Sequence, residues 1–159
     1  MSAIARADLL SELQSLALHD PLTGLPNRRA WDAALSAAVA RAERDGRPLS
    51  AALLDVDAFE EFNDTHGHQA GDRLLKEATA AREREFREGD VLAGWGVDEF
   101  ALLLLGEPLQ KALVIAERLL EAVPQSPCSA GVAEWTPTES ADGVLARAAA
   151  ERFAAKARR

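Results

Sequence analysis

Two adjacent acids, Asp98 and Glu99, stand where the chain leaves a tight turn and enters an apolar run. Gly94 and Gly96 surround the turn, and residues 100–105 are continuously apolar, as in a buried strand. Carboxylates fixed at the end of a rigid strand can hold a hard divalent cation, and Mg²⁺ prefers one or two of them together with substrate phosphates. The pattern is consistent with a magnesium site, and equally with an ordinary hairpin that carries solvated acids at its tip.

A second pair of acids follows another apolar segment. Residues 49–56 predict a strand that delivers Asp55 and Asp57 at its carboxyl end, which is where ligand sites gather in open α/β sheets. A short helix is expected over residues 58–64. Because a helix start has free backbone N–H groups, it would offer donors to phosphate oxygens beside a cation held by these acids.

The elements that position these acids follow from hydrophobic periodicity. A turn is expected over residues 66–72, and the apolar run after Glu99 forms the second strand of a hairpin. Longer helices are expected over residues 1–18, 29–43, 73–86, 109–123 and 141–156, and a last strand over residues 128–135. The order predicts an α/β (α+β) sandwich with one central sheet, and 159 residues suffice for one domain with a sizeable core.

Composition narrows the class of protein. Hydrophobic residues make up 48% and charged residues 28%, as in soluble globular domains, and the net charge of −8 argues against binding a nucleic-acid polymer. The single Cys128 excludes an internal disulfide and a cysteine-based zinc site, and we expect it in the core. No segment is long and apolar enough for a membrane span and no signal peptide is visible, so the expected location is the cytoplasm.

Several motifs together resemble the GGDEF domain of diguanylate cyclases. They occur in the order and spacing of that family: DPLTGLPNR (residues 20–28), DVDAF (55–59), FNDTHGHQAGD (62–72), GVDEF (96–100) and SAGV (129–132). The resemblance implies a central mixed five-stranded sheet flanked by helices, like those of nucleotidyl cyclases and polymerase palms. It also implies two parts, an N-terminal linker or signalling helix over residues 1–18 and the GGDEF domain over residues 19–159.

The family condenses two GTP molecules into cyclic di-GMP and releases two pyrophosphates. By resemblance, Asp55 and Asp98 would bind Mg²⁺ or Mn²⁺ with the Val56 carbonyl as a further ligand, and Glu99 would assist at the same site. Such a metal stabilises the charge that develops on the phosphate.

The resemblance also implies residues for the nucleotide. Asn63 and Asp72 would hydrogen-bond the guanine edge, where an acid suits the two N–H donors that adenine lacks. The amides around Phe59 and Glu60 would cradle the phosphates, and Lys156 would reach the γ-phosphate.

Four positions depart from the family pattern. In the family signature GGDEF, which is GVDEF here (residues 96–100), Val97 replaces the second glycine. A β-branched residue at this position costs ~1–3 kcal/mol if its φ is positive. Its methyl groups would also enter space that the family leaves empty. Glu60 replaces a common lysine near the triphosphate, Gly94 replaces a common arginine, and Ala149 replaces a common aspartate.

An inhibitory site of the family is retained. Arg87 and Asp90 match the Arg-x-x-Asp that binds a cyclic di-GMP dimer, and Arg118 falls where a second arginine of that site lies. Arginine forks suit guanine edges and phosphates. Without the resemblance, the same residues would be an ordinary surface Arg–Asp pair.

Two functions therefore remain open at this stage. In the first, a degenerate GGDEF domain is weak or inactive as a cyclase and binds cyclic di-GMP, GTP or both. In the second, an active diguanylate cyclase uses Mg²⁺ to condense GTP. A homodimer, formed through the N-terminal helix or through bridging cyclic di-GMP, and an upstream sensory domain also remain open.

Overall fold

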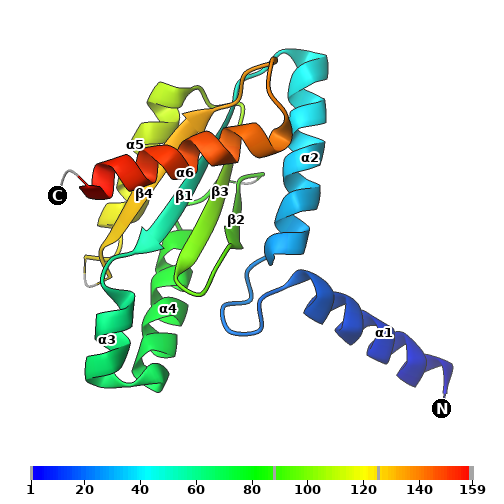
Figure 1. Ribbon diagram of the computed structural model, residues 1–159. Coiled ribbons are helices and arrows are strands. Elements are labelled where there is room, and N and C mark those ends of the chain that lie inside the picture. The colour runs from blue at the N-terminus through cyan, green and yellow to red at the C-terminus, as the bar shows by residue number, and fades with distance from the viewer. Residues whose placement is uncertain (1, 88, 125, 158–159) are drawn as a thin grey trace.

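The computed structural model describes residues 2–87, 89–124 and 126–157, with side chains for all of these except residues 15, 16 and 153–157. Its helices and strands are shown in Figure 1. The helices are α1 (Ala3–Leu18), α2 (Arg28–Asp45), α3 (Phe59–His66), α4 (His68–Glu83), α5 (Leu109–Glu121) and α6 (Ala141–Ala157). The strands are β1 (Leu49–Val56), β2 (Val91–Gly94), β3 (Glu99–Leu105) and β4 (Cys128–Glu134).

The strands form one sheet in the order β2-β3-β1-β4, and each neighbouring pair is antiparallel. The predicted fold class, an α+β domain with a central sheet flanked by helices, is confirmed. The expectation of five strands in a mixed sheet is wrong, since the described residues form four strands without a parallel pair. The fifth strand and the mixed direction were expected only from the family resemblance, whereas hydrophobic pattern alone indicates the four strands that are observed.

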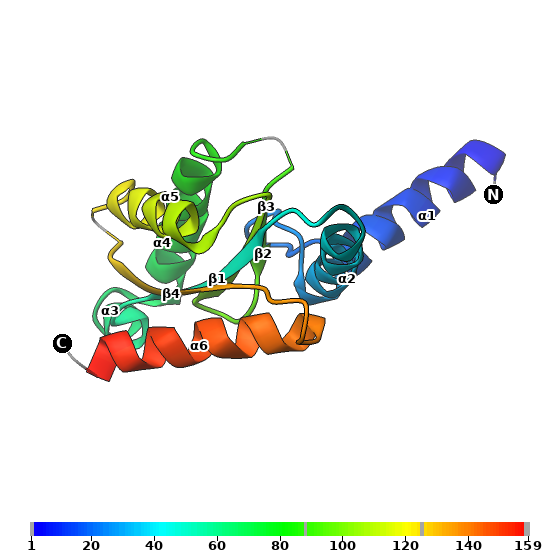
Figure 2. The same cartoon turned by 90° about the horizontal axis from the view of Figure 1, so that it is seen from above.

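Side chains along β1 alternate between two cores, because successive side chains of a strand point to opposite faces. Leu49, Ala51 and Leu53 pack with α2 and α6, whereas Ala52 and Leu54 pack with α4 and α5. Figure 2 shows α6 on one side of the sheet and α4 and α5 on the other. The odd-numbered positions of β1 therefore face the side of the sheet that α2 and α6 cover, called here the α2–α6 face.

The connection between α3 and α4 is tighter than the sequence predicted. The expected turn over residues 66–72 is wrong, because α4 already begins at His68. Gly67 alone turns the chain, with a φ of 91° that few side chains tolerate, and its N–H donates to the Asn63 carbonyl oxygen at 2.7 Å. As a result, Asp72 lies on α4.

The N-terminal helix α1 extends away from the sheet, as Figure 1 shows. Its end is joined to the start of α2 by Asn27. The Asn27 side chain accepts a hydrogen bond from the Ala30 N–H at 3.1 Å, which caps α2, and donates one to the Ala17 carbonyl at 3.0 Å. Large apolar side chains of α1 are exposed, namely Ile4, Leu9, Leu10, Leu13 and Leu18. Within the described residues, none of the helices has the length and apolar character needed to cross a membrane.

Candidate functional site

Asp98 and Glu99 of the β2–β3 hairpin and Asp55 of β1 lie at the same end of the sheet. Asp55 lies opposite Glu99 in the β1–β3 register, and the Val56 N–H donates to the Asp98 carbonyl oxygen at 3.0 Å. Side chains directly opposite each other in an antiparallel pair lie on the same face. Asp55 and Glu99 therefore both project from the α2–α6 face.

The donors gathered here are hard oxygens. Asp55 and Asp98 are half-buried, and Val56, whose carbonyl is the third predicted donor, is buried. Across the described part of the chain, no three His, Cys, Asp or Glu side chains form a complete metal cage. Mg²⁺ takes only one or two carboxylates and completes its shell with water and phosphates, and Mn²⁺ accepts the same ligand types. The donor set thus fits a cation that a phosphate ligand completes.

Asp57 has a partner that the sequence did not reveal. The Ser129 hydroxyl of β4 donates to Asp57 Oδ1 at 2.6 Å, and the Asp57 N–H donates to the Pro127 carbonyl at 2.8 Å. These two bonds tie the residue after β1 to the start of β4. No local pattern predicts a contact between residues 72 positions apart, although Ser129 belongs to a recognised motif.

The start of α3 combines backbone strain with negative charge. Ala58 has a φ of 54°, the one positive value at a non-glycine position among the described residues, and gives α3 no side-chain cap. The first-turn amides, which include those of Phe59 and Glu60, lack intrahelical partners and suit phosphate oxygens. Phe59 is buried and anchors the turn, but Glu60 and Glu61 are exposed acids at this same end. Two acids would repel a phosphate there.

Asn63 and Asp72, the predicted guanine residues, differ in their surroundings. The Oδ1 atom of Asn63 is buried and has no hydrogen-bond partner within the described residues. It lies against Gly71, where an added Cβ would come within 1.7 Å of it. Asp72 is exposed on the next position of α4. A buried amide oxygen that the protein leaves unpaired is a candidate for contact with a ligand.

A cavity of about 380 Å³ lies beside Asp72 and the hairpin turn. Val97 lines this cavity and is 80% exposed, with no positive φ, so the condition for strain at this position is not met. Its side chain nevertheless occupies cavity space that glycine would leave open. Asn63 does not line the cavity. The lining consists of Asp20, Leu22, Thr23, Asn27, Arg28, Asp72, Leu75, Gly94, Trp95, Gly96, Val97 and Phe100.

Trp95, just before the signature, is held from two sides. The Arg28 guanidinium lies 4.0 Å from the centre of the Trp95 ring, and Trp31 meets it edge-on at 6.4 Å. The Trp95 and Gly96 N–H groups both donate to the Glu99 carbonyl, at 2.9 and 3.1 Å. The turn that carries the acids is therefore braced on α2 and closed on itself.

Glu99 also receives a charge-assisted hydrogen bond from a distant helix. Arg152 Nη1 of α6 donates to Glu99 Oε2 at 2.9 Å. No role for Arg152 could be predicted from the sequence, because it is 53 positions from Glu99 and no local pattern pairs the two residues. The side chain of Lys156, one turn further along α6, lies outside the described residues, so its predicted phosphate role stays a prediction.

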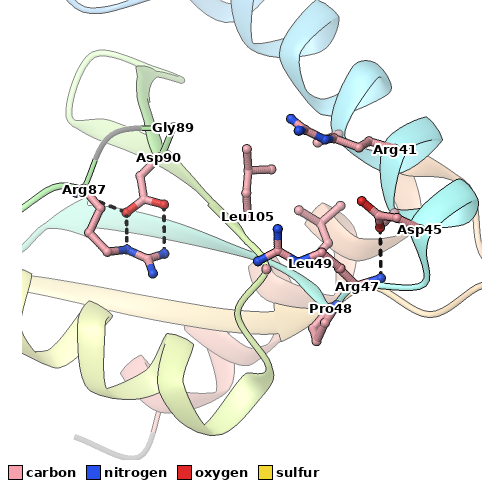
Figure 3. Close-up of a pocket in the computed structure, with 12 residues that line it drawn as sticks. Arg41, Asp45, Arg47, Pro48, Leu49, Arg87, Gly89, Asp90 and Leu105 are labelled. Atoms are coloured by element: carbon pink, nitrogen blue, oxygen red, sulfur yellow. Dashed lines mark hydrogen bonds and ion pairs between the residues drawn. The ribbon is translucent and has the colours of Figure 1, made fainter.

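Arg87 and Asp90 form an ion pair with each other, as the ordinary-surface alternative expected, and their predicted cyclic di-GMP role stays a prediction. Arg87 Nη2 and Nε donate to the two Asp90 oxygens at 3.1 and 3.2 Å, and Arg87 also pairs with Glu107 (Figure 3 shows the Asp90 bonds). The hydrogen bonds to Asp90 are the main cause that raises the pKa of Arg87. The guanidinium is thus held charged and oriented at the loop before β2.

A cavity of about 330 Å³ opens beside this pair, between the loop and α2. Figure 3 shows Arg41 and Arg47 extending from the α2 side toward the side of Arg87 and Asp90. Arg118 is exposed on α5 and is not among the lining residues, so its predicted role in this site stays a prediction. The lining comprises Ala38, Arg41, Ala42, Asp45, Arg47, Pro48, Leu49, Arg87, Gly89, Asp90, Leu105 and Gly106.

A family model and several relatives match most of this chain. The family model described as "Diguanylate cyclase, GGDEF domain" matches residues 17–159. Diguanylate cyclase DgcP of Pseudomonas aeruginosa is 37% identical over 158 residues, which are 92% of this chain and 24% of DgcP. The response regulator PleD of Caulobacter vibrioides is 41% identical over 112 residues, 70% of this chain and 25% of PleD. The chain therefore spans about a quarter of the length of these two relatives.

Solved structures give the same picture. The coiled coil and GGDEF domain of DgcB from Caulobacter crescentus, solved in complex with c-di-GMP, superpose with a TM-score of 0.88 at 31% identity over 96% of this chain and 87% of that one. Diguanylate cyclase SiaD of Pseudomonas aeruginosa, in complex with its activator SiaC, gives a TM-score of 0.85 at 39% identity over 96% of this chain and 63% of SiaD.

Proposed function

Because the chain belongs to the GGDEF domain family of diguanylate cyclases, we propose that it acts in cyclic di-GMP signalling as a degenerate member that binds cyclic di-GMP. Its activity as a cyclase is weak or absent. The observation that carries the proposal is the Arg87–Asp90 pair at the edge of a cavity that Arg41 and Arg47 also line.

The charges of that cavity suit the ligand. Cyclic di-GMP carries two phosphates and two guanine edges. Arg41 and Arg47 supply guanidinium groups that can bind phosphate oxygens or guanine O6 and N7, and the half-exposed Arg87 adds a third. The Asp90 carboxylate is 3% exposed and bonded to Arg87, so it would accept from guanine N–H donors only after Arg87 turns toward the ligand. We keep Arg118 of α5 as a proposed further residue of the site, although it does not line this cavity.

We attribute the weak cyclase activity to the residues that are expected to contact the triphosphate. Mg²⁺ or Mn²⁺, held by Asp55, Asp98 and the Val56 carbonyl with Glu99 beside them, would neutralise phosphate charge. The amides around Phe59 would donate to the same phosphates. However, a carboxylate at position 60 acts against a triphosphate at this helix start, where the helix dipole alone would attract it.

The residues predicted to bind guanine are retained, but the side chain of Val97 leaves less space for the nucleotide. Asn63 and Asp72 would bind the guanine edge. Asp72 lines the cavity, whereas the buried oxygen of Asn63 would first have to become accessible to the nucleotide. Val97 lines the cavity beside Asp72, and its side chain takes up volume that glycine would leave free. Backbone strain does not add to this effect, because the φ of Val97 is not positive. GTP binding is therefore expected to be weak rather than lost.

A second candidate function is an active cyclase that condenses two GTP into cyclic di-GMP. One observation favours it, namely that Asp55, Val56, Asp98 and Glu99 come together at neighbouring strand ends. A site that had lost its chemistry entirely would not be expected to retain every predicted metal donor.

We assign α1, within residues 1–18, to linkage or signalling and residues 19–159 to the GGDEF domain proper. The exposed apolar side chains of α1 suit contact with a second copy of the chain or with an upstream sensory domain. Cyclic di-GMP bridging two copies at the Arg87 cavity is the other route to a dimer.

Incubation with GTP and Mg²⁺, followed by chromatography of the products, tests the proposal against the second candidate. The parent chain should form little or no cyclic di-GMP, and Val97→Gly combined with Glu60→Lys should form clearly more. Glu83→Lys, which makes the same charge change at the far end of α4, is the control and should resemble the parent. Rapid turnover by the parent would establish the second candidate instead.

A further inference from the structure

The guanidinium group of Arg152, on α6, reaches the acidic residues of the proposed active site. Arg152 Nη1 and Glu99 Oε2 are 2.9 Å apart, and the two side chains are only 17% and 33% exposed. Partial burial of both partners strengthens their attraction, because water screens it less than at an open surface. Arg152 therefore differs from Arg147 of the same helix, which pairs with Glu139 just before α6 and is 48% exposed.

Close contact between the backbones of α6 and β4 fixes the position of Arg152. A Cβ added at Gly131 of β4 would lie 2.0 Å from the Ala148 carbonyl oxygen and 2.4 Å from the Arg152 nitrogen. The α6 backbone thus rests directly on β4 at this glycine. Gly131 pairs with Leu53 in the β1–β4 register, two residues before Asp55. Close packing therefore seats Arg152 over the α2–α6 face, from which Asp55 and Glu99 project.

Three further acids lie at this end of the sheet. Asp55 lies opposite Glu99, the Asp57 carboxylate is bonded to Ser129, and Asp98 precedes Glu99 in the turn. Clustered carboxylates repel one another, and a fixed guanidinium offsets that repulsion. A divalent cation would do the same, so it competes with the guanidinium for the negative charge of Glu99.

We propose that Arg152 is a positioning residue that holds Glu99 when the site contains no metal and so sets the concentration of divalent cation that the site requires. The inference rests on the metal site of the proposed function. Arg152 stabilises the acids of the empty site, and binding of the cation weakens the Arg152–Glu99 pair. Removing the guanidinium charge therefore favours the cation.

Mn²⁺ alone is the probe, measured by the loss of the free Mn²⁺ signal in electron paramagnetic resonance during titration of the full chain. Arg152→Gln should bind Mn²⁺ about three- to tenfold more tightly than the parent. Arg152→Lys keeps the charge and should remain close to the parent. Arg147→Gln removes the same charge from α6 away from Glu99 and should leave the affinity unchanged.

A double-mutant cycle with Glu99→Gln tests whether the effect passes through Glu99. The gain from Arg152→Gln should disappear in the Glu99→Gln background, and a gain that persists there would overturn the assignment. Thermal melts without metal identify a variant that does not fold, in which case Arg152→Met replaces it.

The outcomes separate this inference from the proposed metal site. If Asp55→Asn abolishes Mn²⁺ binding but Arg152→Gln binds no more tightly than the parent, the metal site stands and the role of Arg152 is refuted. If neither the parent nor Arg152→Gln binds Mn²⁺, both are refuted. Binding by Arg152→Gln alone would support the inference most strongly.

Discussion

The side chain of Asn63 occupies the space next to Gly71 that any other residue would fill, since an added Cβ at Gly71 would lie 1.7 Å from Asn63 Oδ1. The two residues come from different helices, α3 and α4, which the single turn residue Gly67 connects. Because Gly71 has no side chain, the side chain of Asn63, a predicted guanine contact, can lie against it.

Gly71→Ala should displace the Asn63 amide and weaken binding of a non-hydrolysable GTP analogue to about the same extent as Asn63→Ala. The physical reason is that the added methyl group takes the place of Oδ1. Calorimetry with Mg²⁺ present measures both variants, and the double variant should bind no more weakly than either single one. Full affinity in Gly71→Ala would show that Asn63 does not contact the nucleotide.

Gly131→Ala should destabilise the fold by about 1–3 kcal/mol, as expected when a packed contact is overfilled. The added methyl group has no space, because α6 lies against β4 at this point. Denaturant unfolding gives the free energy of unfolding of parent and variant.

The matched control is Gly94→Ala in β2, where the nearest atoms to an added Cβ are 4.0 Å away. This change should alter the free energy of unfolding by no more than about 0.5 kcal/mol. Equal losses for the two variants would contradict the close contact between α6 and β4.

Cys128 should be unreactive in the folded chain. Burial raises the pKa of its thiol to about 11, and only the thiolate attacks a disulfide reagent. At pH 8 an aromatic disulfide reagent should label the protein rapidly in denaturant and very slowly without it. Equal labelling rates in the two conditions would mean that the start of β4 is not packed as described.

Much of the framework could be predicted from local pattern. The strand over residues 49–56 was predicted with its observed bounds, as was the start of α5 at Leu109. Asp55 and the turn acids were predicted at strand ends, because continuous apolar runs bounded by glycine or acidic residues identify buried strands. These features depend on residues close together in sequence.

Features that depend on distant residues could not be predicted. The contacts of Arg152 with Glu99 and of Ser129 with Asp57 join residues 53 and 72 positions apart. The same limit applies to strand direction, which depends on how β1 is placed between β3 and β4. The expectation of five strands came from the family resemblance, whereas the local pattern itself indicates four. At Val97 the residue type suggested strain if φ were positive, but the φ of Val97 is not positive.

Binding of cyclic di-GMP at the Arg87 cavity should be independent of metal. The Arg87–Asp90 pair belongs to the loop before β2 and to a cavity that contains none of the predicted metal donors. Charge-assisted hydrogen bonds of this type contribute ~1.5–3 kcal/mol. Loss of Arg87 should therefore weaken binding about tenfold or more.

The most direct measurement is a calorimetric titration of cyclic di-GMP into the parent chain, Arg87→Ala and Arg44→Ala, each with and without a chelator. Arg44 is an exposed arginine of α2 outside the cavity lining, so its variant controls for net charge. We predict binding to the parent and to Arg44→Ala with equal affinity in both conditions, and at least about tenfold weaker binding to Arg87→Ala. Equal affinity in the parent and Arg87→Ala, or no binding to the parent, would contradict the proposed function.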